Sequence, residues 1–210
     1  MHQVSEGVRA GELSLITAAS GVGRSKWAEF YNGRTGPGYL AYVRERYRPF
    51  ISAIASRIRP NDLVLEIGCG TGTITKALCD LAKVQGAPRS VVFAASDADP
   101  EMVQTTRARL WNDNAAVFAL DCTNAKHFTE AEVVHSHGML EHFDDHTIRQ
   151  VIHNFRKARV QVHYVPGLYD APTFGDERLM SVEQWEDICA PDQIITFNDG
   201  LDYALIFERK

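Results

Sequence analysis

From residue 63 onward, short apolar runs alternate with longer stretches that carry apolar residues at helical spacing, and this alternation limits the fold more than any other feature. Strand–helix alternation of this kind forms right-handed crossovers, which build a parallel sheet covered by helices on both faces. The pattern therefore predicts an α/β fold with a mostly parallel sheet. The expected strands span 63–68, 90–96, 115–120, 132–136 and 158–165, and the expected helices span 71–84, 100–111 and 144–157.

The two ends of the chain depart from this alternation. Residues 193–197 and 202–209 predict an antiparallel β-hairpin with an Asn-Asp-Gly turn, which brings the sheet to seven strands. A helix over 181–190 comes before the hairpin, with Ser181 and Gln184 spaced for a capping box. Residues 36–60 predict one long amphipathic helical region that ends at Pro60. We expect an N-terminal arm and helical lid segment over 1–60 and one domain over 61–210.

Composition limits the cellular compartment and the binding partners that we expect for the protein. The net charge of -5 provides no basic surface, which argues against nucleic acid as a partner. The four cysteines form no CxxC pair and the N-terminus lacks the apolar core of a signal peptide, so we expect a reduced, cytoplasmic protein. No apolar run approaches 18 residues, so no membrane span is expected. The sequence does not indicate an oligomeric state.

Two glycine-bearing loops compete as the ligand site. The first, over residues 18–25, is one step from a phosphate-binding P-loop, with Ser25 in the hydroxyl position. However, Ala18 stands where that loop needs glycine, and Arg24 stands where it needs lysine, for which arginine is a poor substitute. Nucleotide binding by this segment is therefore the weaker alternative.

The second loop runs from Glu66 to Gly72, after an expected strand and at the start of an expected helix. Backbone amides and the helix dipole favour an anionic group at such a turn. The next strand ends at Asp97, where a carboxylate can accept hydrogen bonds from both hydroxyls of a ribose. The second loop therefore has the support that the first lacks.

Four segments in order carry a resemblance to a known family: VLEIGCGTG (64–72), ASDADPEMV (95–103), ALDCTN (119–124) and VVHSHGMLEHFDD (133–145). Together they resemble the motifs of class I S-adenosylmethionine-dependent methyltransferases, over roughly residues 60–208. The terminal hairpin is similar to that of the family's seven-stranded sheet. The resemblance implies S-adenosylmethionine as the cofactor.

The resemblance also implies which residues line the cofactor site. In it, the glycine loop holds the methionyl part above Glu66, Asp97 takes the ribose hydroxyls, and Asp121 takes the adenine amino group. By analogy, Arg34 could meet the cofactor carboxylate. The full set is Glu66, Gly68, Cys69, Gly70, Thr71, Asp97, Ala98, Met102, Asp121, Cys122, His137, Gly138 and Arg34.

A histidine-rich segment follows the fourth expected strand. Glu141-His142 matches the end of a Glu-x-x-Glu-His motif that binds magnesium in some related methyltransferases, but Gly138 replaces its first glutamate. Because a hard cation loses a preferred ligand there, we expect no bound metal. The catalytic candidates are His142, His137 and Glu141, with either histidine as a general base. The alternative is that Glu141 and His142 only brace the start of the next helix.

Two segments outside the sheet are expected to form the acceptor pocket, the N-terminal region and the insertion over 166–181. Their candidate residues are Trp27, Phe30, Tyr31, Arg34, Tyr39, Tyr169, Phe174, Glu177 and Arg178. The size and acidity of the chain favour methylation of an oxygen or nitrogen atom of a small molecule, with a protein or peptide side chain as the second choice. The main alternative is a non-catalytic partner subunit that binds S-adenosylmethionine.

Overall fold

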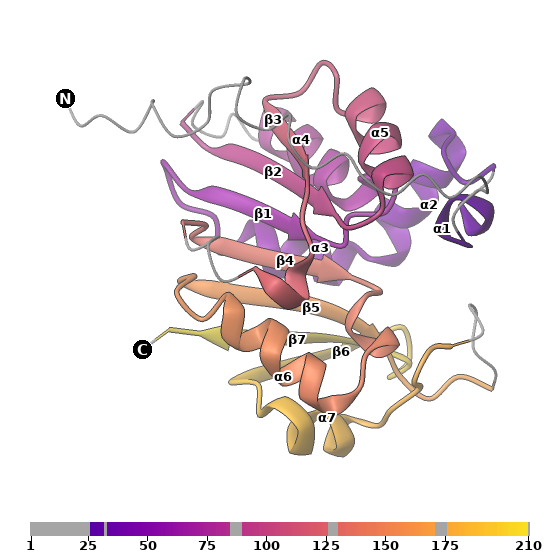
Figure 1. Cartoon of the computed structure of the whole chain (residues 1–210), viewed down its shortest axis with the longest axis vertical. Helices are drawn as coiled ribbons and strands as arrows, with labels where there is room; N and C mark the ends of the chain where they lie inside the picture. Colours follow the sequence, from indigo (N-terminus) through magenta and orange to yellow (C-terminus); the bar gives the residue numbers. More distant parts are fainter. Residues whose placement is uncertain (1–25, 32, 85–89, 126–129, 171–175, 210) are drawn as a thin grey trace.

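The computed structural model describes residues 26–31, 33–84, 90–125, 130–170 and 176–209. Its seven strands form one sheet in the order β3-β2-β1-β4-β5-β7-β6 (Figure 1). The strands β1 to β5 pair in parallel, whereas β7 is antiparallel to both β5 and β6. Their bounds are β1 Leu63–Ile67, β2 Val92–Asp97, β3 Ala115–Ala119, β4 Val133–His137, β5 Val160–Pro166, β6 Gln193–Phe197 and β7 Asp202–Glu208. The predicted seven-stranded α/β sheet with its terminal antiparallel hairpin is confirmed.

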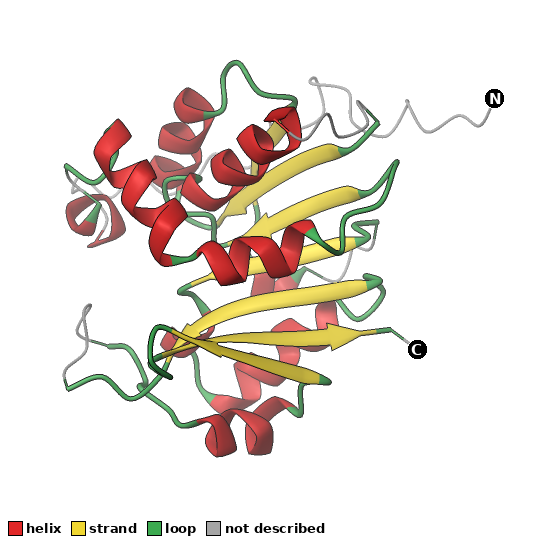
Figure 2. Cartoon of the chain, turned by 180° about the vertical axis from the view of Figure 1, so that it is seen from behind, coloured by secondary structure: helices red, strands yellow, loops and turns green. Residues whose placement is uncertain are grey.

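Helices cover both faces of the sheet (Figures 1 and 2). Successive residues of a strand point to opposite faces, so Val64 packs with α3 and α4 and Leu65 packs with α6 and α7. Phe50 of α3 and Trp185 of α7 are fully buried anchors of these two layers. The helices are α1 Lys26–Phe30, α2 Pro37–Arg46, α3 Arg48–Ala55, α4 Thr73–Val84, α5 Pro100–Arg109, α6 Asp145–Asn154 and α7 Val182–Cys189, with short 3-10 turns η1 Cys122–Asn124 and η2 Leu140–His142.

The single long helical region expected over residues 36–60 is wrong in one respect, because the structure divides it into α2 and α3. The break falls at Tyr47, whose φ of -102° and ψ of 20° leave the helical range. Pro49, at the start of α3, explains the break: a proline lacks the N–H that would continue the preceding helix, and its ring clashes with the carbonyl four residues earlier. The predicted capping box of Ser181 and Gln184 is present at the start of α7.

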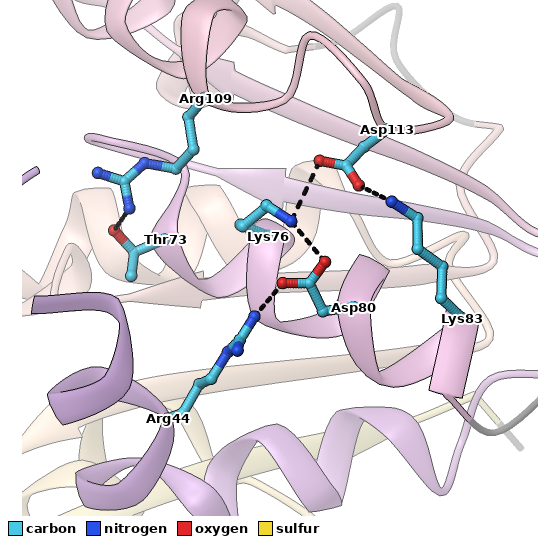
Figure 3. Close-up of polar contacts among 7 residues, drawn as sticks. All are labelled: Arg44, Thr73, Lys76, Asp80, Lys83, Arg109 and Asp113. Carbon is cyan, nitrogen blue, oxygen red and sulfur yellow. Dashed lines mark hydrogen bonds and ion pairs between the residues drawn. The ribbon is translucent and has the colours of Figure 1, made fainter. Parts of the chain in front are cut away.

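Charged side chains fix α4 against its neighbours (Figure 3). Asp80 of α4 pairs with Arg44 of α2 and with Lys76 one turn earlier. Asp113, whose side chain is 2% exposed, pairs with Lys83 and lies 3.6 Å from Lys76. Because α4 begins at the second glycine-rich loop, these contacts also fix the position of that loop. The first glycine-bearing loop, over residues 18–25, lies outside the described residues.

Candidate functional site

The second glycine-rich loop joins β1 to α4 in a backbone conformation that requires glycine. Gly68, Gly70 and Gly72 have φ values of 64°, 52° and 67°, which side-chain-bearing residues rarely adopt. Beneath the loop, the carboxylate of Glu66 accepts hydrogen bonds from the Thr75 hydroxyl and from the Thr75 backbone N–H at 3.0 Å. Burial raises the pKa of Glu66 to about 8, against the opposing effect of these hydrogen bonds. Glu66 thus ties β1 to the first turn of α4.

Asp97 connects this loop to the end of β2. One of its oxygens accepts from the Gly70 N–H at 2.8 Å, and the other accepts from the Asp99 N–H at 2.9 Å. Burial raises the pKa of Asp97 above its ordinary value. The carboxylate therefore lies where the carboxyl ends of two adjacent parallel strands meet, which is the usual ligand position in open α/β sheets.

The third and fourth motifs supply the remaining edge of the site. Asp121 caps η1 by accepting from the Thr123 N–H at 3.0 Å, and the Sγ of the buried Cys122 lies 3.8 Å from the Sδ of Met139. The Met139 side chain fills the space that a Cβ on Gly68 would need. Of the predicted residues near the adenine, Met102 is buried and Ala98 is exposed. Thr71 is buried as well.

The loop is braced by two residues to which the motif comparison assigned no role. The Thr106 hydroxyl donates to the Gly70 carbonyl at 2.8 Å, and a Cβ on Gly72 would lie 2.5 Å from the Thr106 methyl group. The available signal was helical spacing, since Thr106 lies four residues after Met102 and so on the same face of α5. Met139 left no comparable signal, because its position depends on how β4 ends.

Tyr31 covers the loop from the N-terminal segment. Its ring lies against Gly70, where an added Cβ would be 3.2 Å from the nearest ring atom. Burial raises the pKa of the Tyr31 phenol far above its ordinary value. Tyr31, Glu66, Cys69 and His137 line a cavity of only about 20 Å³ at this point, and a second cavity of about 290 Å³ extends from Tyr31 to Met102. The loop and Asp97 fit the cofactor, but the tyrosine ring occupies the space directly above Gly70.

The histidines of β4 are held as neutral groups. Burial lowers the pKa of His135 and of His137 to about 3. The ring of His137 stacks on Tyr164 with centroids 4.5 Å apart and meets Tyr47 edge-on at 4.2 Å. Since an imidazole with so low a pKa does not hold a proton near neutral pH, this environment argues against His137 as the general base.

His142 contacts an acidic residue and an aromatic residue that come from two other segments. Its Nδ1 lies 2.6 Å from a carboxylate oxygen of Asp176, and its ring meets Trp27 edge-on at 5.0 Å. Asp176 in turn pairs with Lys26 at 2.7 Å. The N-terminal segment and the segment before α7, both expected to form the acceptor pocket, therefore meet at His142.

Other residues expected in the acceptor pocket or at the cofactor make contacts that do not involve His142. Tyr169 hydrogen-bonds to Asp202, and Arg178 donates to the Phe143 carbonyl at 2.7 Å. Arg34, expected at the cofactor carboxylate, places its guanidinium 4.0 Å from the centroid of the Phe30 ring. Phe174 lies outside the described residues.

Three potential metal ligands also meet here. Glu141, His142 and Glu177 each offer one ligand atom, and these atoms all lie within 4.8 Å of one another. The expectation of no metal considered only the segment after β4, where Gly138 replaces a glutamate. Glu177 comes from the insertion more than thirty residues later, so its proximity was not visible from local spacing.

Comparisons with known proteins agree with this geometry. Residues 64–160 match the family described as methyltransferase domain. No curated protein sequence matches the chain. Within the described ranges, no helix has the length and apolar character needed to cross a membrane.

Solved structures with the same fold share little sequence with the chain. A possible exported protein from Bordetella parapertussis is 18% identical, with a TM-score of 0.66, over 92% of this chain and 76% of that one. PigF with SAH is 16% identical, with a TM-score of 0.61, over 89% of this chain and 62% of that one. The mitomycin 7-O-methyltransferase MmcR is 10% identical, with a TM-score of 0.60, over 88% and 61%. The chain thus spans about three fifths of the length of the last two.

The matched segment contains the glycine loop, Asp97, Asp121 and the end of β4, which are the parts that build the site described above. Residues 64–160 therefore form a methyltransferase domain, and the chain has the class I, Rossmann-like fold of the S-adenosylmethionine-dependent methyltransferases.

Proposed function

We propose that the protein transfers a methyl group from S-adenosylmethionine to an oxygen or nitrogen atom of a small molecule. The observation that carries this proposal is the bridge from Asp97 to Gly70, which joins the ends of β1 and β2 into one cradle beside the end of β4. The net charge of -5 favours a small acceptor over nucleic acid. The structural similarity to MmcR, a mitomycin 7-O-methyltransferase, supports the same substrate class.

In this proposal the residues of the cradle have separate roles. The carboxylate of Asp97 accepts hydrogen bonds from the ribose, and the loop Gly68–Gly70 lies along the methionyl part. Glu66 holds the loop in place through Thr75. S-adenosylmethionine supplies a methyl group on a sulfonium, which is already a good leaving group, so the chain mainly has to align the acceptor.

His142 is the group that we assign to proton removal. As the acceptor gains the methyl group, its O–H or N–H proton passes to the imidazole. The Asp176 carboxylate, 2.6 Å from Nδ1, orients the ring. His137 instead lines the wall of the site as a neutral ring.

The test compares cofactor binding in Asp97→Asn and Asp99→Asn by calorimetric titration with S-adenosylmethionine, S-adenosylhomocysteine and ATP. Asp97→Asn removes the charged ribose acceptor, and we expect at least a tenfold loss of affinity for the first two ligands. Asp99 accepts from the Glu101 N–H at 2.8 Å as the N-cap of α5, a role that asparagine preserves, so Asp99→Asn should bind like the wild type.

Catalysis is tested separately by release of S-adenosylhomocysteine with a panel of phenolic, hydroxylated and amine acceptors. His142→Asn should bind cofactor normally and lose most of the turnover. Cofactor binding without product from any acceptor would favour a non-catalytic subunit. ATP binding that is indifferent to Asp97 would contradict the proposal and point to residues 18–25.

A further inference from the structure

Glu141 is a buried carboxylate, one oxygen of which is unsatisfied in the part of the chain that the structure describes. The residue is 2% exposed, and its Oε2 has no hydrogen-bond partner among the described residues. Burial, together with the nearby carboxylates of Glu177 and Asp176, raises the pKa of Glu141 to about 8. A buried acid that faces two other acids is costly unless a cation or a proton neutralises it.

The backbone holds the second acid beside the first. The Arg178 N–H donates to the Glu141 carbonyl at 3.0 Å, which attaches the segment before α7 to η2. The Arg178 side chain secures this contact by donating to Asp145 at 2.6 Å. Glu177 is therefore placed next to Glu141 by main-chain geometry, rather than by the chance position of a surface side chain.

The separation of the donor atoms suits one cation. The ligand atoms of Glu141, His142 and Glu177 lie within 4.8 Å of one another. Ligands held at about 2.1–2.3 Å from one metal ion are themselves separated by roughly 3 to 4.6 Å. The three side chains therefore reach a common centre with little movement.

His142 is held as metal-binding histidines usually are. Such a histidine commonly bonds through one ring nitrogen to a carboxylate, which fixes the ring and leaves the other nitrogen for the metal. Here Asp176 contacts Nδ1 at 2.6 Å, and Lys26 secures Asp176 at 2.7 Å. Asp176 is a positioning residue in this arrangement.

We propose that Glu141, His142 and Glu177 bind a divalent cation, with Asp176 orienting the histidine. Two carboxylates favour a hard ion, while the imidazole admits ions softer than magnesium, so Mn²⁺ suits the donor set. Three protein ligands leave coordination positions for water or for oxygen atoms of an acceptor. An imidazole nitrogen that binds a cation cannot also accept a proton, so metal binding and the proton removal assigned to His142 exclude each other at that nitrogen. The acceptor contact rests on the proposed function, whereas the metal site does not.

The experiment is a calorimetric titration of the full chain with MnCl₂ after removal of bound metal by a chelator, with Mg²⁺ and Zn²⁺ titrated in parallel. We expect the wild type to bind one equivalent of Mn²⁺ in the micromolar range and to melt at a higher temperature with Mn²⁺ present. Glu141→Gln and Glu177→Gln should each weaken binding at least tenfold. The matched control is Glu186→Gln, which changes an exposed carboxylate on α7.

Two further variants keep the result decisive. Asp97→Asn should lose S-adenosylmethionine and keep Mn²⁺, so failure of the cofactor site and failure of the metal site are distinguishable. Glu177 is less buried than Glu141, so Glu177→Gln still tests the site if Glu141→Gln does not fold. The proposal is overturned if none of the three cations binds below millimolar concentration, or if Glu186→Gln weakens binding as much as Glu177→Gln.

Discussion

At the scale of single residues, the buried Glu66 makes the fold sensitive to pH. Its folded pKa of about 8 lies above its ordinary value, so the stability that it contributes is complete below about pH 4.5 and is lost as the pH rises through 8. Glu66→Gln keeps an oxygen for Thr75 but cannot ionise. Between pH 5 and 8 we expect the wild type to lose on the order of 3 kcal/mol more unfolding free energy than this variant.

Urea unfolding of both proteins at pH 5, 6, 7 and 8 measures this difference. A distant buried acid such as Glu141 affects both proteins equally, so the gap between the two curves reports Glu66 together with its coupling to Asp97. Glu186→Gln, at an exposed position, should run parallel to the wild type. A gap between the wild type and Glu66→Gln that stays constant with pH would show that the folded carboxylate ionises normally.

At the scale of elements, the segment that follows α1 closes the cofactor cradle with Tyr31. The cavity between Tyr31 and Cys69 is about 20 Å³, far below the roughly 300–1,000 Å³ of small-molecule sites, and the Tyr31 ring fills the space above Gly70. Cofactor entry and exit therefore require Tyr31 to move. Tyr31→Ala should raise both the association and the dissociation rate of S-adenosylhomocysteine several-fold, as measured by stopped-flow fluorescence.

A second tyrosine provides the control for this prediction. Tyr42 on α2 is 53% exposed, so Tyr42→Ala removes a similar ring from the same N-terminal region without opening the cradle. Its rates should equal those of the wild type. Unchanged association in Tyr31→Ala would mean that the cofactor enters by a route that avoids α1.

The order of the elements and the residues on the sheet were predictable, whereas contacts between distant segments were not. The glycine loop and Asp97 follow directly from strand ends, because parallel strands bring their carboxyl ends to one edge. Tyr31 over Gly70 and Glu177 beside Glu141 depend on how connecting segments fold back, which periodicity does not encode. Pro49 in the sequence signals the break at Tyr47, but apolar residues at helical spacing on both sides of it suggested one continuous helix.

At the scale of the whole molecule, one buried carboxylate joins the N-terminal helices to the terminal hairpin. Asp202, at the start of β7, is fully buried. It pairs with Arg46 of α2 at 2.9 Å and accepts from the Tyr164 hydroxyl of β5 at 2.7 Å. Tyr169 and Asn198 also donate to it. Segments from both ends of the chain therefore depend on a single charge.

Asp202→Asn keeps the shape of this side chain but removes its charge and directs an N–H group toward donors. Arg46, whose side chain is 27% exposed, is left without its carboxylate. Breaking a fully buried pair costs about 3–5 kcal/mol, and the partial exposure of Arg46 reduces this to about 2–3 kcal/mol. We expect a loss of that size in urea unfolding.

Glu208→Gln tests the other end of β7, where the ion pair with Arg57 is exposed and should contribute less than about 1 kcal/mol. If the charge pair carries the effect, adding Arg46→Met to Asp202→Asn should recover part of the loss. If the double variant instead loses the sum of the two single-variant losses, the effect of Asp202→Asn comes from the hydrogen bonds of the tyrosines.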